Sequence, residues 1–196
     1  MLRHKFYTWR CERRYGISTG GFIHPGELGV TNSDATSYVA LQYEYLHWGL
    51  AAIPFTPSDV VFLDYGAGKG RAMAVAAAQP FRRVIGVEIS EALAATARRN
   101  LARMRGRRAG LVEMHVADAA SFPVPDDANV FFLFNPFTGA TLAEVTRRMH
   151  QSWCAHPRDL FVIFFNHREF DERIADEPWL RKIHETAFCG FYSTTS

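Results

Sequence analysis

The sequence has few cysteines and no close pair of them. Its 196 residues include three, Cys11, Cys154 and Cys189, and these lie far apart along the chain. An odd number of widely spaced cysteines does not form a disulfide framework or a structural zinc site. We therefore expect reduced thiols, no bound metal and a cytoplasmic protein.

Long apolar runs are missing as well. No stretch approaches the roughly 20 consecutive apolar residues that cross a bilayer. The first residues, MLRHKFYTWRCERRYG, lack the apolar segment of a signal peptide. Hydrophobic residues still make up 48% of the chain, which is enough for a sizeable core. The composition predicts one soluble domain with an appendage and no membrane partner.

The chain has no strong excess of charge of either sign. Lysine and arginine number 22 against 20 acidic residues, so the net charge of +2 does not by itself predict a polyanion partner. One dense basic run stands out, made up of Arg98, Arg99, Arg103, Arg105, Arg107 and Arg108. Most of it falls near the C-terminal end of a predicted helix, where cations suit the helix dipole. We interpret it as a solvated helix face rather than a nucleic-acid site.

Two prolines, Pro54 and Pro57, divide the chain into two parts. Before them, residues 16–29 are typical of a glycine-rich loop. Residues 37–50 are predicted to form a helix. Its apolar face would carry four residues spaced three or four apart: Tyr38, Leu41, Tyr45 and Trp48.

After the prolines, short apolar strands alternate with helices. The predicted strands cover residues 60–64, 83–88, 111–116, 129–134 and 160–165. The predicted helices cover residues 71–79, 142–153 and a segment that begins at Ser90, a good N-cap. Residues 180–196 are predicted to form an antiparallel pair that turns near Gly190.

This alternation predicts an α/β fold. We expect a Rossmann-like, doubly wound, mostly parallel sheet with helices on both faces. Residues 58–196 would form this domain, and residues 1–57 a helical and loop extension that acts as a lid. In such sheets ligands bind beyond the carboxyl ends of the strands, where the strand order reverses.

The first feature at a strand end is the segment DYGAGKGR, residues 64–71. Alternating glycines let the chain turn tightly and bring its backbone close to a ligand. The spacing excludes a Walker loop, and Arg71 stands where a GxGxxG fingerprint needs its last glycine. We expect five residues of this turn to bind a cofactor: Asp64, Gly66, Ala67, Gly68 and Gly70.

Acidic residues follow the next two predicted strands. Glu88, with Ile89 beside it, comes 22 residues after Gly66, so adjacent parallel strands place its carboxylate where it can accept both hydroxyls of a ribose. Asp118 follows the third strand and can accept the exocyclic amine of an adenine, while the backbone amide of Ala119 reads the ring. The alternative for Asp118 is a loop residue that caps its own turn.

The fourth strand ends in Asn135-Pro136-Phe137. A side-chain amide and a backbone fixed by proline can offer carbonyl oxygens to an incoming amine, with Phe137 as an apolar wall. The alternative is that Asn-Pro simply turns the chain.

Four segments resemble, in order, the motifs of class I S-adenosylmethionine-dependent methyltransferases: FLDYGAGKGR, RVIGVEIS, VADA and FLFNPF. The resemblance covers residues 60–165. It implies S-adenosylmethionine as cofactor, with the glycine turn at its methionine end, Glu88 at the ribose, and Asp118 or Ala119 at the adenine. Lys69 and Arg71 lie in the glycine turn, where they would pair with Asp64 or with the methionine carboxylate; the alternative is a role on the helix surface.

Finer resemblances bear on the methyl acceptor. The segment RRYGISTGG is similar to a group of small bacterial members, and the DxGxGKGR form with the strand-end Asn is similar to non-SET protein-lysine methyltransferases. Asn-Pro-Phe is similar to the NPPF-type motif of amino-group methyltransferases, although its single proline speaks against a nucleic-acid base.

The predicted function is therefore N-methylation of an amine, on a protein lysine or a small molecule. Asn135 would contact the cofactor and orient the acceptor, and Tyr38 would close the site. Weaker candidates for a base are His24, Glu27, Glu44 and His167. Two alternatives stay open, an NAD(P)-dependent oxidoreductase and a non-catalytic S-adenosylmethionine-binding regulatory module.

Overall fold

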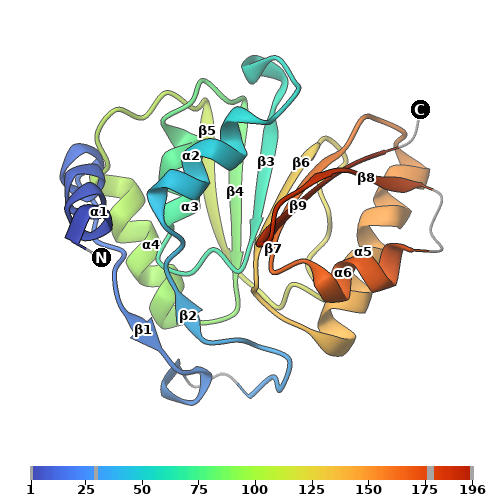
Figure 1. Cartoon of the computed structure of the whole chain (residues 1–196), viewed down its shortest axis with the longest axis horizontal. Helices are drawn as coiled ribbons and strands as arrows, with labels where there is room; N and C mark the ends of the chain where they lie inside the picture. Colours follow the sequence, from blue (N-terminus) through green and yellow to red (C-terminus); the bar gives the residue numbers. More distant parts are fainter. Residues whose placement is uncertain (1, 29–30, 176–178, 195–196) are drawn as a thin grey trace.

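The computed structural model describes residues 2–28, 31–175 and 179–194. Its main feature is a seven-stranded sheet with the order β5-β4-β3-β6-β7-β9-β8 (Figure 1). Five strands are parallel: β3 (Val61–Tyr65), β4 (Arg83–Glu88), β5 (Leu111–Val116), β6 (Val130–Phe134) and β7 (Phe161–Phe165). The other two, β8 (Leu180–Glu185) and β9 (Cys189–Thr194), pair antiparallel. The predicted α/β fold is confirmed.

Successive residues of each central strand enter different apolar clusters, because side chains alternate between the two faces of a sheet. In β3, Phe62 packs into the cluster that contains α3 (Arg71–Ala77), and Leu63 into the cluster that contains α5 (Gly139–Ala155). In β6, Phe132 packs into the cluster that contains α3, and Phe131 into the cluster that contains α5. Burial on both faces explains why these strands read as continuous apolar runs.

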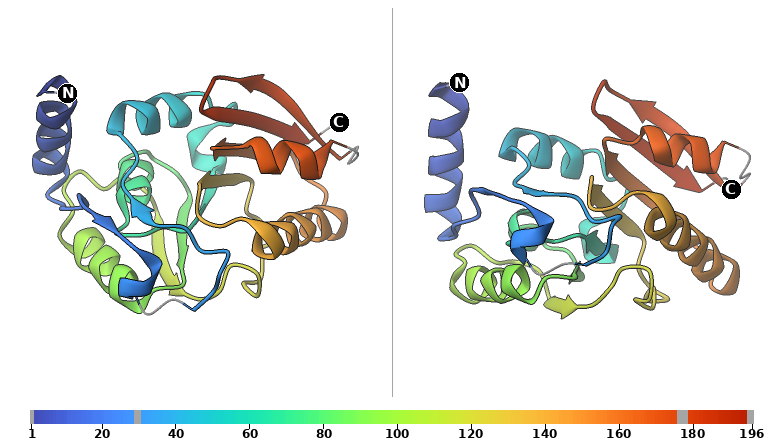
Figure 2. Two further views of the ribbon diagram at one scale, coloured as in Figure 1. Left: turned by 60° about the horizontal axis from the view of Figure 1, so that its bottom comes forward. Right: turned by 90° about the horizontal axis from the view of Figure 1, so that it is seen from below.

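The helices that follow the strands form where the sequence predicts them. Helix α4 (Glu91–Arg103) begins after Ser90, whose hydroxyl accepts the backbone N–H of Leu93 at 3.4 Å. Helices α5 and α6 (Arg168–Ile174) lie on one side of the molecule, away from α1 and α4 (Figure 2). Helix α6 was not predicted, because seven residues are too few to show a helical period.

The first 60 residues form several short elements. These are α1 (Leu2–Tyr15), β1 (Phe22–Ile23), a 3-10 turn (Pro25–Leu28), β2 (Tyr38–Val39), α2 (Tyr43–Ala51) and a second 3-10 turn (Pro57–Asp59). Helix α1 packs on α2 through Tyr15, whose ring stacks on Tyr43 at 6.0 Å between centroids. In the described part of the chain, no helix is long and apolar enough to cross a membrane.

The predicted helix over residues 37–50 is wrong in its first half. Residues 38–39 form strand β2, which pairs antiparallel with β1, and the helix begins only at Tyr43. The predicted apolar face is also wrong, since Tyr45 and Trp48 are 41% and 39% exposed. The buried residues of α2 are Tyr43, Leu46, Gly49 and Leu50. The prediction failed because it read apolar residues of strand β2 and of helix α2 as one helical period.

The predicted antiparallel pair at the end of the chain is present, but its turn is not at Gly190. The turn covers residues 186–188, and Gly190 lies within β9, opposite Glu185. A side chain at position 190 would meet the Tyr192 hydroxyl at 2.3 Å. This glycine therefore serves close packing in a strand rather than chain reversal.

Candidate functional site

One pocket opens at the carboxyl ends of the parallel strands, where the strand order reverses between β3 and β6. It encloses about 990 Å³, counting the part that opens to solvent. Eleven of the predicted site residues line it: Tyr38, Asp64, Gly66, Ala67, Glu88, Ile89, Asp118, Ala119, Asn135, Pro136 and Phe137. Gly68 and Gly70 lie outside its lining.

The glycine turn is held tightly between its neighbours. Gly66 and Gly68 have φ of +74° and +54°, which favour glycine. A Cβ atom at Gly66 would lie 2.4 Å from Pro136 Cβ, and one at Gly68 2.4 Å from Tyr38 Cε2. The absence of side chains therefore lets Pro136 and Tyr38 lie directly against the turn.

The backbone N–H groups of the turn point mainly into the protein. Those of Gly66 and Ala67 donate to the Val87 carbonyl at 2.9 and 3.0 Å, and that of Gly68 donates to Glu88 Oε2 at 2.8 Å. These bonds fix the turn to the end of β4. The edge formed by Gly66 and Ala67 is the part that borders the pocket.

Asp64 is the most deeply buried acidic group of the pocket. It is 2% exposed, and its Oδ2 has no hydrogen-bond partner among the described residues. Burial, with the nearby charge of Glu88, raises the pKa of Asp64 to about 8. An unpartnered buried carboxylate is costly. A cation or N–H donor bound in the pocket would relieve that cost.

Glu88 is oriented by two backbone groups. Its Oε2 accepts the N–H of Gly68 and its Oε1 accepts the N–H of Ser90 at 2.9 Å. Burial raises the pKa of Glu88, while these backbone bonds act in the opposite direction. Each carboxylate oxygen has two lone pairs, so both can still accept a hydroxyl group. The carboxylate is thus pre-oriented to bind a diol.

Asp118 lies at the pocket between Ala117 and Ala119. Its Oδ1 accepts the backbone N–H of Ala120 at 2.9 Å, so this oxygen does cap its own loop, as the alternative interpretation predicts. The same side chain borders the pocket. The capping bond fixes the orientation of the side chain there.

Asn135 follows the last residue of β6 and has a left-handed conformation, with φ of +44°. Its Oδ1 accepts a hydrogen bond from Asn166 Nδ2 at 2.9 Å, and its backbone carbonyl accepts one from the Thr36 hydroxyl. Asn166 follows the adjacent strand β7 and is also left-handed, with φ of +63°. Two linked asparagines therefore stand at neighbouring strand ends. Sequence analysis missed Asn166, which has no motif around it.

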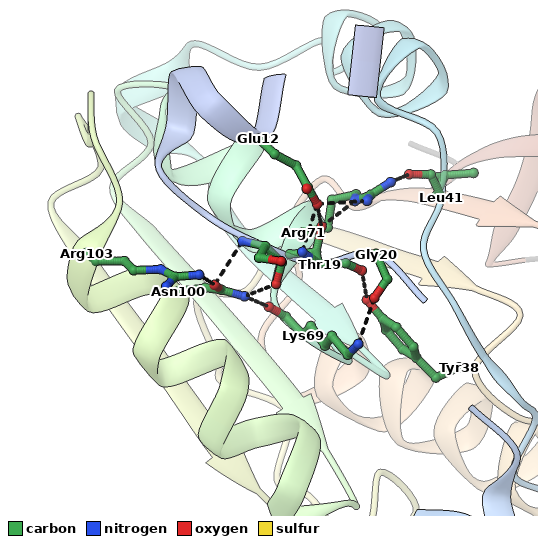
Figure 3. Close-up of polar contacts among 10 residues, drawn as sticks. Glu12, Thr19, Gly20, Tyr38, Leu41, Lys69, Arg71, Asn100 and Arg103 are labelled. Carbon is green, nitrogen blue, oxygen red and sulfur yellow. Dashed lines mark hydrogen bonds and ion pairs between the residues drawn. The ribbon is translucent and has the colours of Figure 1, made fainter. Parts of the chain in front are cut away.

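Arg71 connects the N-terminal segment to the glycine turn (Figure 3). Its Nε donates to Thr19 Oγ1 at 2.6 Å, its Nη1 to the Leu41 carbonyl at 2.8 Å, and its Nη2 lies 3.2 Å from Glu12 Oε1. The predicted pairing of Arg71 with Asp64 is wrong, because these three acceptors already bind the guanidinium.

Lys69 and Tyr38 extend this network over the turn (Figure 3). Lys69 Nζ donates to the Gly20 carbonyl at 2.7 Å and lies 5.0 Å from the centre of the Tyr38 ring, so its predicted pairing with Asp64 is also wrong. Tyr38 donates its hydroxyl hydrogen to the Thr19 carbonyl at 2.5 Å. Burial raises the pKa of Tyr38, so the phenol stays protonated.

Arg71 is expected to be important for stability. Arg71→Leu removes the guanidinium that bonds to Glu12, Thr19 and Leu41 in a largely buried region and leaves the Glu12 carboxylate without its cation, so we expect a loss of about 2–3 kcal/mol in the free energy of unfolding. The matched control is Arg147→Leu, because Arg147 pairs with Glu144 on an exposed helix face and should change stability by less than about 1 kcal/mol. Urea unfolding measures both. Equal losses in the two variants would contradict the role of the network.

Asp64 is expected to make stability depend on pH. In the unfolded chain this carboxyl loses its proton near pH 4, but in the folded protein near pH 8. Between these values the folded state binds more protons, so raising the pH lowers the free energy of unfolding, on the order of 1 kcal/mol per pH unit. Above pH 8 the effect levels off. We expect Asp64→Asn to remove this slope in urea unfolding between pH 5 and 8, and parallel curves for the two proteins would count against it.

The four weaker candidates for a base lie outside the pocket lining. His24, Glu27, Glu44 and His167 are each bonded elsewhere, for example His167 Nδ1 to Asp171 Oδ2 at 2.7 Å. His167, Asp171 and Glu185 lie close enough to hold a metal ion. However, Lys182 Nζ already lies 2.9 Å from Asp171 and 2.6 Å from Glu185, so an ammonium group occupies the space between these carboxylates.

The pocket lies where the strand order reverses, and it combines a glycine turn with acids at two successive strand ends. This combination is typical of α/β proteins that bind nucleosides. Residues 62–153 match the family model described as a methyltransferase domain. No curated protein sequence matches the chain. The match to the family model covers 92 of the 196 residues, and it supports the resemblance to class I S-adenosylmethionine-dependent methyltransferases with S-adenosylmethionine as cofactor.

Solved structures share the fold at low sequence identity. Ribosomal protein L11 methylase from Lactobacillus delbrueckii subsp. bulgaricus is 13% identical, with a TM-score of 0.58 over 79% of this chain and 78% of that one. A methyltransferase from Pseudomonas syringae is 16% identical, with a TM-score of 0.55 over 79% and 99%. Magnesium protoporphyrin IX methyltransferase from Synechocystis PCC 6803, with bound S-adenosylmethionine, is 15% identical, with a TM-score of 0.50 over 79% and 77%.

Proposed function

We propose that the protein methylates an amine nitrogen, on a protein lysine or on a small molecule. This proposal rests on which residues line the pocket. Among the described residues that line the pocket there is no histidine, lysine or cysteine, and the acids Asp64, Glu88 and Asp118 belong to the ends of β3, β4 and β5. A hydroxyl acceptor would need a base near Asn135. A neutral amine needs only orientation, since it attacks through its own lone pair.

The residue roles in cofactor binding follow from the same geometry. S-adenosylmethionine, when bound, supplies a methyl group on a sulfonium. Glu88 would accept the ribose hydroxyls, and Asp64 would bind the methionine ammonium through its unpartnered Oδ2. Asp118 and Ala119 would border the adenine. Gly66, Ala67 and Ile89 would supply the pocket walls between these groups.

Asn135 would orient the acceptor. Its carbonyl oxygens each keep a lone pair beyond the bonds from Thr36 and Asn166, so they can accept the N–H groups of an amine. The amine nitrogen forms the new bond to carbon as the carbon–sulfur bond breaks, and the electron pair of that bond stays on sulfur. The surplus proton on nitrogen leaves to water. Pro136 and Phe137 would exclude water beside the reacting atoms.

Residues 1–57 would act as the lid of the domain formed by residues 58–196. Tyr38 lies against Gly68 and lines the pocket, and its position depends on Thr19 and Lys69. This arrangement supports a role for Tyr38 in closing the site rather than in proton transfer, because burial keeps its phenol protonated.

The test uses cofactor with a radiolabelled methyl group and a fractionated cell extract. We expect label in protein or in small amines, in a form that survives mild alkali, as N-methyl groups do. Label that is released by alkali would indicate methyl esters and would contradict amine methylation. Label confined to nucleic acid would contradict the proposed acceptor class. The Asn135→Gly protein serves as the control for transfer at this site.

A further inference from the structure

The outer face of α1 carries two large aromatic rings. Phe6 and Trp9 are 58% and 54% exposed, and their rings stack at 5.9 Å between centroids. Arginines lie over both rings, Arg10 at 5.9 Å from the centre of Phe6 and Arg13 at 5.5 Å from that of Trp9. Exposed aromatics interleaved with arginines are typical of surfaces that bind a partner.

Packing of α1 does not need these rings. The helix is anchored from its opposite side, where Cys11 and Tyr15 are buried and the Tyr15 hydroxyl bonds to His47 Nε2 at 3.0 Å. The packing of α1 on the core therefore does not explain why two large aromatic residues, Phe6 and Trp9, occupy its exposed side.

The basic run of residues 98–108 lies beside the C-terminal end of α1. The backbone N–H of Arg105 donates to the Tyr15 carbonyl at 2.8 Å, and α1 and α4 lie on the same side of the molecule in Figures 1 and 2. Residues 1–16 hold five lysines and arginines and residues 98–108 hold six, so these two segments contain half of the 22 in the chain. Glu12 is the one acid in either segment, and it already bonds to Thr19 and Arg71.

Most of these charges are available to a partner. Among the described residues, eight exposed arginines of the two segments form no ion pair with a carboxylate: Arg10, Arg13, Arg14, Arg99, Arg103, Arg105, Arg107 and Arg108. Elsewhere arginines are commonly paired, as Arg82 is with Asp127 and Arg147 is with Glu144. A surface of arginines without carboxylate partners is complementary in charge to a polyanion.

We propose that this surface, the outer face of α1 together with residues 103–108, binds single-stranded nucleic acid. The guanidinium groups would contact phosphates, and the rings of Phe6 and Trp9 would stack with unpaired bases. An anionic membrane is the alternative partner, because aromatic and basic residues on one helix also suit an interfacial helix, and the test below separates the two. The interpretation of residues 98–108 as only a solvated helix face is thereby revised. This partner is separate from the methyl acceptor.

The test measures the fluorescence anisotropy of a labelled 12-nucleotide oligouridylate with the full chain. We expect binding that weakens about 50-fold between about 50 mM and about 200 mM salt, as for roughly four phosphate contacts. Arg107→Glu with Arg108→Glu, and separately Phe6→Ala with Trp9→Ala, should each weaken it by about tenfold or more. The matched control reverses two exposed arginines on other elements, Arg147→Glu with Arg181→Glu, and should change affinity less than about threefold.

S-adenosylmethionine binding, measured on each variant, shows that the protein is folded and keeps this test apart from that of the methyl acceptor. Binding that is unchanged by the surface variants overturns the proposal. Equal affinity for a duplex of the same length overturns the stacking role. Binding to phosphatidylserine vesicles without binding to the oligonucleotide overturns the proposal of nucleic-acid binding and indicates a membrane as the partner.

Discussion

Replacing Gly66 with alanine is expected to abolish measurable cofactor binding. Gly66 has φ of +74°, a conformation that costs other residues about 1–2 kcal/mol, and a Cβ atom there would lie 2.4 Å from Pro136 Cβ. Pro136 must then move, and it lines the pocket beside Asn135. We expect the affinity for S-adenosylmethionine to fall at least about 100-fold, equivalent to about 2.7 kcal/mol. Isothermal calorimetry measures it.

A substitution at a second glycine separates the effect of backbone strain from the effect of the clash with Pro136. Gly106 has nearly the same φ, +72°, but no atom lies within 4 Å of the position of its Cβ. Gly106→Ala should therefore lower the free energy of unfolding by about 1 kcal/mol and leave cofactor affinity unchanged. If Gly66→Ala bound S-adenosylmethionine as tightly as Gly106→Ala, the close packing of Pro136 on the turn would have no part in the site.

Asn135→Gly is expected to separate binding from catalysis. Glycine accepts the left-handed backbone at this position, so the fold and the turn into Pro136 should persist. The variant lacks the side-chain amide that is proposed to orient the acceptor. We expect methyl transfer to fall on the order of 100-fold, because poor positioning of reacting groups has an effect of that size. The affinity for S-adenosylmethionine should stay within about threefold of the original.

Asn135→Ala provides a comparison, because alanine adds backbone strain to the same loss of the amide. It should be less stable than Asn135→Gly but equally slow in methyl transfer. Asn166→Gly tests the neighbour that donates to Asn135, and we expect a smaller loss of activity. Full activity in Asn135→Gly would remove the proposed role of this residue, whatever the stability of the variants.

The sequence predicted the parallel sheet because its central strands β3, β4, β6 and β7 are buried on both faces and are long enough to show this as apolar runs. The ends of β4 and β5, at Glu88 and Val116, lie where the sequence placed them. The pocket followed from topology, since Asp64, Glu88 and Asp118 each lie at or just after the carboxyl end of a parallel strand and such ends meet at one edge.

The first 60 residues were less predictable. Strand β2 has only two residues, and its position depends on contacts with β1 and with Gly68 rather than on a local pattern. The partners of Arg71, namely Glu12, Thr19 and Leu41, come from three places in the chain. Spacing along one sequence carries no signal for such long-range bonds. The pairing of Asn135 with Asn166 was missed for the same reason.

The most direct test of the account is a calorimetric titration of the folded protein and of Glu88→Ala with S-adenosylmethionine, and of the folded protein with NAD. We predict one binding site for S-adenosylmethionine, affinity at least about 100-fold weaker in Glu88→Ala, and no response to NAD. If S-adenosylmethionine gave no response, or if Glu88→Ala bound it as tightly as the unaltered protein, then the glycine turn and the strand-end acids would not form one cofactor site.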